Sequence, residues 1–117
     1  MNKRGTGSEG ERIASDFLIK NGLRIVEKNF RDRYGEIDIV AKDADTLVFV
    51  EVKLRTDDFL GDPLEAVDAG KQRTIRNVAR QYLYEKGLGD VWCRFDVLGI
   101  RNADGEGFDI DWIKDAF

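Results

Sequence analysis

The sequence predicts an α/β fold, in which a mixed central sheet of about five strands is flanked by helices. Apolar residues recur at helical spacing in residues 8–22 and 71–86. Runs rich in β-branched and aromatic residues occupy residues 23–30, 37–41, 47–53, 91–100 and 108–113. The predicted order is therefore helix, three strands, helix, two strands. We expect residues 1–117 to form a single domain, because this length can build one core but not two.

The first predicted helix covers residues 8–22, and the polar, glycine-bearing residues 1–7 are expected to be loose. Ser8 and Glu11 have the S-x-x-E spacing of a capping box. Spacing alone therefore favours Glu11 as a cap residue. Asn21 and Gly22 supply the stop signal, and the strand that follows is expected to turn Leu23, Ile25 and Val26 inward.

A β-hairpin is predicted between residues 35 and 55, GEIDIVAKDADTLVFVEVKLR. Residues 47–53 are nearly all apolar, as in a strand that is buried on both faces. Asp38, Glu51 and Lys53 interrupt the apolar runs. Side chains alternate along a strand, so Glu51 and Lys53 share a face, and the hairpin can bring Asp38 beside them.

These three charged residues suit a site for Mg²⁺ or Mn²⁺ with a lysine beside it. Buried charges are costly unless they are paired or bind a metal, and hard divalent cations prefer oxygen ligands. Taken alone, however, the E-V-K tripeptide of residues 51–53 also fits a solvated cross-strand ion pair. The acid inside GEIDIV favours the site.

A polar loop is expected over residues 55–62, followed by a short helix over residues 63–67 that breaks near Gly70. The second main helix, residues 71–86, turns a basic face away from its apolar stripe: Lys71, Arg73, Arg76 and Arg80. Such a face is either solvated or binds phosphate, and both interpretations stay open. Gln72 lies at the edge of the apolar stripe, from which it could reach the sheet.

The last two strands are joined by a turn over residues 102–107. Phe108, Ile110 and Trp112 alternate with acids, which indicates an edge strand with one wet face. We expect Cys93 to be an inert core residue.

Composition excludes several kinds of chemistry. The chain has no histidine and one cysteine, so Ser-His-Asp catalysis, Cys-His catalysis and Cys₄ or histidine-bearing zinc sites are excluded. Carboxylates, lysine, arginine, tyrosine or a hard metal remain. The net charge of −4 argues against a generic polyanion binder and favours a protein-interaction domain as a rival, although a local basic face can bind nucleic acid.

The sequence also predicts a cytoplasmic protein. No apolar run approaches the ~20 residues that cross a bilayer, so we expect no membrane partner. No apolar segment follows the basic residues near the start, so no signal peptide is expected. Cys93 has no partner for an internal disulfide, which favours a reducing compartment.

An acid on the second strand and E-x-K on the third resemble the PD-(D/E)XK nuclease superfamily. The resemblance implies a restriction-endonuclease-like fold with an αβββαβ core. Local motifs resemble the YraN family of small bacterial proteins, which are thought to be similar to archaeal Holliday junction resolvases. These motifs are GSEGER-x-A (residues 7–14), NFR (29–31), GEIDIV (35–40), FVEVK-x-R (49–55), G-x-P-x-EAV (61–67), KQ (71–72), RFDV (94–97) and the final AF.

The resemblance implies roles for several residues. Asp38 and Glu51 match the metal-binding carboxylates, and the Val52 carbonyl would be a third ligand. Lys53 matches the lysine that activates water and offsets charge on the phosphate. Glu11 matches an acid of the first helix in resolvase-like members, and Gln72 matches a glutamine or lysine of the second helix. The basic residues that would hold flanking phosphates are Arg55, Lys71, Arg73, Arg76 and Arg80.

The function implied is a metal-dependent nuclease that uses Mg²⁺ or Mn²⁺ on DNA, including branched or repair intermediates. A homodimer is also implied, because resolvase-like relatives cut two strands, although the sequence shows no dimer seam. The alternatives are a nucleic-acid-binding module without catalysis and an acidic protein-interaction domain.

Overall fold

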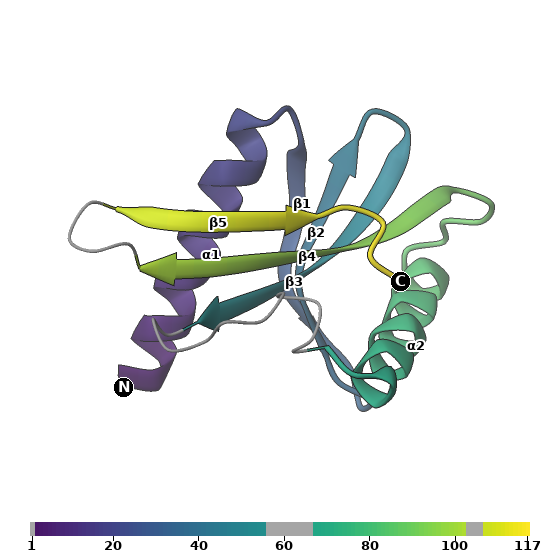
Figure 1. Cartoon of the computed structure of the whole chain (residues 1–117). Coiled ribbons are helices and arrows are strands. Elements are labelled where there is room, and N and C mark those ends of the chain that lie inside the picture. The colour runs from purple at the N-terminus through teal and green to yellow at the C-terminus, as the bar shows by residue number, and fades with distance from the viewer. Residues whose placement is uncertain (1, 56–66, 103–106) are drawn as a thin grey trace.

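The computed structural model describes residues 2–55, 67–102 and 107–117 (Figure 1). Its elements are α1 (Asn2–Lys20), β1 (Arg24–Arg31), β2 (Glu36–Asp43), β3 (Thr46–Arg55), α2 (Ala69–Glu85), β4 (Trp92–Asn102) and β5 (Phe108–Ile113). The predicted order of helix, three strands, helix and two strands is confirmed. The predicted loop and short helix of residues 55–67, and the turn of residues 102–107, fall largely outside the described residues.

The five strands form one mixed sheet in the order β1-β2-β3-β4-β5. Neighbouring strands are antiparallel except β3 and β4, which pair in parallel from Thr46 opposite Trp92 to Arg55 opposite Arg101. A parallel pair requires a crossover connection, and α2 lies in it. The nearly continuous apolar run of β3 follows from its central position, and β5 is at the edge as predicted.

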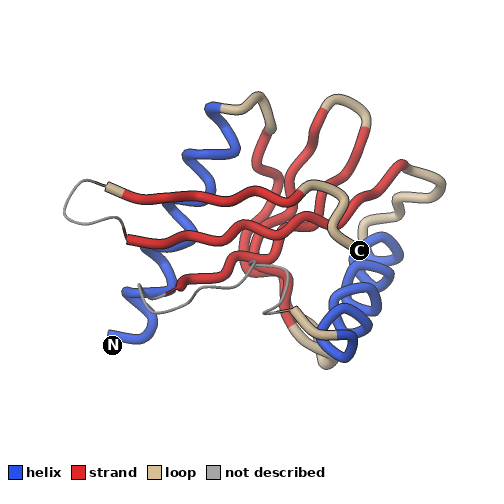
Figure 2. The backbone as a smooth tube through the Cα atoms, viewed as in Figure 1, coloured by secondary structure: helices blue, strands red, loops and turns tan. Residues whose placement is uncertain are grey.

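Each face of the sheet is covered by one helix (Figures 1 and 2). On one face, α1 buries Ala14 and Leu18 against a cluster that includes Ile39, Val48, Val50 and Leu98. On the other face, α2 buries its predicted stripe of Ile75, Val78, Ala79 and Tyr82 against Val40, Phe49 and Val97. Both helices thus pack their apolar stripes against β2, β3 and β4, on opposite faces of the sheet.

Two expectations about element ends and one about a buried side chain are wrong. Helix α1 begins at Asn2, so residues 2–7 are helical and Ser8 lies inside the helix instead of capping it. The early glycines weaken a helix by about 1 kcal/mol each but do not interrupt its hydrogen bonds. Helix α2 begins at Ala69 and includes Gly70, because Asp68 is its N-cap and accepts a hydrogen bond from the Lys71 amide at 2.8 Å. Val26 is exposed, because the register of β1 shifts there.

A buried acid joins β4, β5 and the C-terminal segment. Asp96 is fully buried, and its carboxylate accepts hydrogen bonds from the Arg94 guanidinium, the Trp112 indole at 2.9 Å and the Asp115 amide at 2.9 Å. Arg94 also donates to Asp43 at the end of β2, at 2.9 Å. Every oxygen of the buried carboxylate is therefore satisfied, which is the condition for keeping a charge in a core.

Within the described ranges, neither helix combines the length and the apolar character that a membrane crossing requires.

Candidate metal site

The site begins where β2 and β3 separate. Their backbone register runs from Asp43 opposite Thr46 to Ile39 opposite Val50. One residue further along β2, the Asp38 Oδ2 atom accepts a hydrogen bond from the Val52 amide at 2.8 Å. A side chain thus takes the place of a backbone partner and holds its carboxylate in the gap between the strands. The carbonyl of a strand residue points to the same side as its amide, so the Val52 carbonyl faces this gap as well.

Three carboxylates meet at the gap. Glu11 of α1 and Glu36 and Asp38 of β2 each offer an oxygen, and these atoms lie within 4.8 Å of one another. Helix α1 lies close to β3 at the residue before Glu11, where a Cβ atom on Gly10 would lie 2.9 Å from Cδ2 of the exposed Leu54 side chain.

Burial and neighbouring carboxylates raise the pKa of Asp38 to about 7. Burial is the largest cause, followed by the negative charge of Glu51, while the hydrogen bond from the Val52 amide acts in the opposite direction. Glu36 and Glu11 add smaller repulsions of the same sign. The folded protein therefore disfavours the ionised form of the Asp38 carboxyl group.

Asn29 orients the acid of the first helix. Its Nδ2 atom donates a hydrogen bond to Glu11 Oε1 at 2.9 Å. Lys28 pairs with Ile39 and Phe30 with Ile37, so Asn29 lies across from Asp38. Its backbone has a φ of 57°, in the left-handed region that asparagine tolerates better than most residues. Sequence reasoning gave no role to Asn29 or to Glu36, and the only signal was an asparagine set among strand-forming residues.

Glu51 lies next to two lysines. Its side chain is nearly fully buried, and its Oε2 atom is 3.6 Å from Lys53 Nζ and 3.4 Å from Lys71 Nζ. The structure thus brings Glu51 and Lys53 together, and Glu51 contributes to the raised pKa of Asp38. Lys71, which the sequence assigned to a phosphate-binding face, reaches Glu51 from the first turn of α2.

The other predicted residues of α2 have different surroundings. The Gln72 side chain donates to the Val67 carbonyl at 3.0 Å, within the segment that enters the helix. Arg73, Arg76 and Arg80 are exposed. The Arg76 guanidinium lies 5.3 Å from the centre of the Phe117 ring, and Arg80 donates to Asn77 at 3.0 Å. The side chain of Arg55 lies outside the described residues.

The donor atoms of the cluster fit a hard divalent cation. All are oxygens, from Glu11, Glu36 and Asp38, and the Glu51 carboxylate is near enough to raise the pKa of Asp38. Mg²⁺ and Mn²⁺ prefer such oxygen ligands. A divalent cation bound here would favour the ionised form of Asp38, which burial and the neighbouring acids disfavour.

Helix α1, the antiparallel strands β1 to β3 and a parallel fourth strand reached through α2 form a restriction-endonuclease-like core, with acids on the second and third strands. The chain belongs to the uncharacterised protein family UPF0102, whose model matches residues 10–100. UPF0102 is the YraN family, so the match confirms the resemblance to that family drawn from the motifs.

Two relatives illustrate the match. A UPF0102 protein of Chromohalobacter salexigens is 46% identical over 114 residues, which cover 97% of this chain and 91% of that protein. A UPF0102 protein of Caldicellulosiruptor saccharolyticus is 43% identical over 118 residues and is covered completely, as is this chain. A solved structure of Pyrococcus furiosus SfsA in complex with Ca²⁺ covers 96% of this chain and 63% of that chain, at 14% identity and a TM-score of 0.36. That last likeness is too weak to carry an argument.

Proposed function

We propose that this protein is a metal-dependent nuclease that hydrolyses phosphodiester bonds in DNA, with branched or repair intermediates among its substrates. One observation carries the proposal. Glu11 of α1 and Glu36 and Asp38 of β2 gather at the gap between β2 and β3, the charge of Glu51 on β3 reaches Asp38, and two lysines contact Glu51. Phosphodiester hydrolysis needs this combination, because a water must be activated and extra negative charge at phosphorus must be stabilised.

Asp38 and Glu51, with Glu11 or Glu36 and the Val52 carbonyl, would hold the metal. Bound Mg²⁺ or Mn²⁺ supplies a Lewis acid and lowers the pKa of a bound water. Groups of the chain itself orient the carboxylate ligands. The Val52 amide fixes the direction of the Asp38 carboxylate, and Asn29 fixes that of Glu11.

Lys53 and Lys71 place positive charge beside the acids, where it can offset the charge that develops on the attacked phosphate. Arg73 and Arg80 are exposed on α2 and can contact flanking phosphates, which would give affinity without sequence preference. An acidic protein can therefore bind DNA through this one face.

The test is a cleavage assay with Mg²⁺ and with Mn²⁺ on single-stranded, duplex, flapped and four-way-junction DNA. Glu51→Gln and Asp38→Asn should abolish cleavage and leave the circular dichroism spectrum unchanged. Glu9→Gln is the matched control, because its carboxylate is exposed on α1 and lies outside the cluster. Cleavage at the wild-type rate by both site variants, or no cleavage of any substrate by the wild type, would contradict the proposal.

A second candidate is a nucleic-acid-binding module without catalysis. The contacts of Glu51 favour this candidate, because two lysines neutralise the Glu51 carboxylate without a metal ion. This reading predicts salt-sensitive DNA binding in EDTA that persists in Asp38→Asn, with no cleavage when metal is added.

A further inference from the structure

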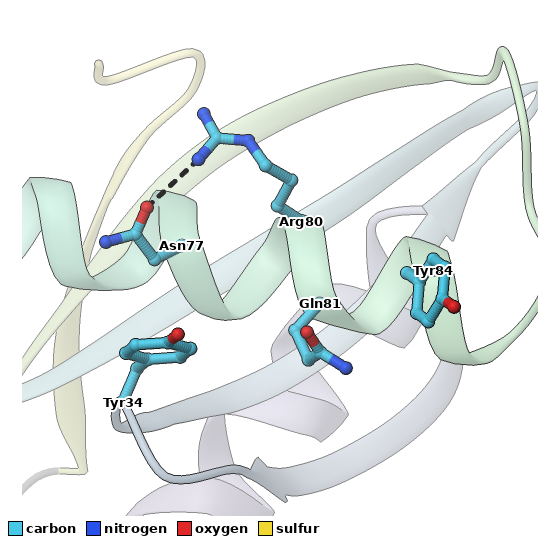
Figure 3. A pocket seen from close by; sticks show the side chains of 5 residues that line it. All are labelled: Tyr34, Asn77, Arg80, Gln81 and Tyr84. Carbon is cyan, nitrogen blue, oxygen red and sulfur yellow. Dashed lines mark hydrogen bonds between the residues drawn. The ribbon is translucent and has the colours of Figure 1, made fainter.

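An open pocket of about 310 Å³ lies between α2 and the turn that precedes β2 (Figure 3). Its walls are the side chains of Tyr34, Asn77, Arg80, Gln81 and Tyr84. None of these five is an acid or an aliphatic residue. Figure 3 shows Tyr34 facing the helix from the turn, with the other four side chains on successive turns of α2.

The two tyrosines are unusually accessible for large aromatic side chains. Tyr34 is 51% exposed and Tyr84 is 82% exposed. The Arg33 guanidinium lies 5.1 Å from the centre of the Tyr34 ring and donates to its hydroxyl at 3.2 Å, so this ring is held in place without being covered by the core. Exposed aromatic rings of this kind are the groups on which unpaired bases stack.

The polar side chains of the pocket complement the other parts of a nucleotide. Asn77 and Gln81 carry carboxamides, which can donate to and accept from the edge of a base. Arg80 is oriented by its hydrogen bond to Asn77 and carries the positive charge that a phosphate requires. Two acids lie nearby: Glu85 accepts a long hydrogen bond of 3.5 Å from Gln81, and Asp32 accepts one of 2.7 Å from the Tyr34 amide.

We infer that this pocket binds an unpaired nucleotide of single-stranded DNA. The inference rests on the proposed function, because that function brings a DNA strand to the carboxylate cluster. Stacking on tyrosine requires a free base face, which a base inside a duplex does not offer. The pocket therefore selects substrates with an unpaired segment, such as a single strand or a flap, over continuous duplex.

The pocket is close to the carboxylate cluster along the chain, because Tyr34 is two residues before Glu36, an acid of the cluster. Lys71 contacts Glu51 at the start of α2, and Asn77 follows six residues later, about 9 Å along the helix and about 120° around its axis. Between them, Thr74 packs against the turn, where a Cβ atom on Gly35 would lie 2.8 Å from Thr74 Cγ2. A strand bound at the cluster can therefore reach the pocket within a few nucleotides, along the turn that carries Tyr34.

The test measures binding by fluorescence anisotropy in EDTA, where metal-dependent cleavage cannot occur. The probes are a labelled twelve-nucleotide oligo(dT) and a labelled twelve-base-pair duplex. Tyr34→Ala and Tyr84→Ala should each weaken binding of the single strand by about tenfold, the effect of losing one stacked base. Tyr34→Phe should bind like the wild type, because the ring remains, and the duplex affinity should change less than twofold.

Phe108→Ala is the matched control, since this exposed ring is on β5 and is not among the residues that line the pocket. The inference is overturned if the wild type does not bind the single strand, if both tyrosine-to-alanine variants bind it normally, or if duplex binding falls equally. Because the readout needs no catalysis, loss of binding in the tyrosine variants would support the pocket even if the cleavage assay failed. Cleavage with no dependence on the tyrosines would support only the proposed hydrolysis.

Discussion

Neutralising Asp38 should stabilise the fold while it removes the metal site. A pKa raised from 3.8 to about 7 corresponds to roughly 4 kcal/mol of unfavourable free energy for the ionised group. Water still reaches this partly buried side chain, and screening reduces that figure to about 2 kcal/mol. Asparagine keeps an oxygen that can accept the hydrogen bond of the Val52 amide, so Asp38→Asn removes the charge with little change in geometry.

The effect depends on pH in a defined direction. Between pH 3.8 and about 7, the folded state holds the Asp38 proton more tightly than the unfolded chain does. The free energy of unfolding of the wild type therefore decreases as the pH rises through this window, and this contribution is constant above it. The free energy of unfolding of Asp38→Asn does not decrease in this way. The difference in stability between the variant and the wild type should therefore be small near pH 4 and largest above pH 7.

The assay is urea unfolding in EDTA at several pH values between 5 and 8.5, followed by fluorescence or circular dichroism. We expect Asp38→Asn to be more stable than the wild type by about 2 kcal/mol at pH 8. Mg²⁺ should then stabilise the wild type and leave the variant unchanged, because only a ligand that binds the folded state raises its stability.

A matched control is Asp16→Asn, whose carboxylate is exposed on α1 and pairs with Arg12 at 3.7 Å. It should change the stability by less than about 0.5 kcal/mol at any pH in the range. An Asp38→Asn variant that is less stable than the wild type at pH 8, or whose advantage does not grow with pH, would refute the electrostatic reasoning.

Three further substitutions test the site and its scaffold. Asp96→Ala should lower the free energy of unfolding by about 3–5 kcal/mol in a urea titration, because it leaves a half-buried guanidinium without its main partner. Asn29→Gly keeps the left-handed backbone but loses the hydrogen bond to Glu11, so stability in EDTA should change little while stabilisation by Mn²⁺ weakens. Gly35→Ala should destabilise by about 1–3 kcal/mol through contact with Thr74. Adding Thr74→Ser, which removes the contacting methyl group, should restore much of that loss in the same titration.

The residue pattern predicted the sheet well, because a strand that is buried on both faces, such as β3, is apolar at nearly every position. The predicted bounds of the last strand, residues 108–113, agree with the structure, and those of β3 differ by one residue at the start and two at the end. The start of α1 was missed because a capping-box spacing also occurs inside a helix. Asp68 was missed as the cap of α2 because Gly70 suggested a break.

The site was predictable only in part. Asp38, Glu51 and Lys53 lie within one hairpin, so strand alternation was enough to associate them. Asn29 and Lys71 act through tertiary contacts, to Glu11 of α1 and to Glu51 of β3, which no local spacing encodes. Their contributions depend on how closely the helices approach the sheet.

The parallel pairing of β3 with β4 sets the order in which the chain can fold. Strands β1, β2 and β3 are joined by short turns and can associate soon after they are synthesised. Strand β3 can pair with β4 only after Trp92, the residue opposite Thr46, has been synthesised. The buried Asp96 gains its last partner only from Asp115, 19 residues further along the chain. A ribosome-bound chain thus carries every carboxylate of the cluster long before its sheet can close. We expect a slow refolding phase that Asp96→Ala alters more than Asp38→Asn does.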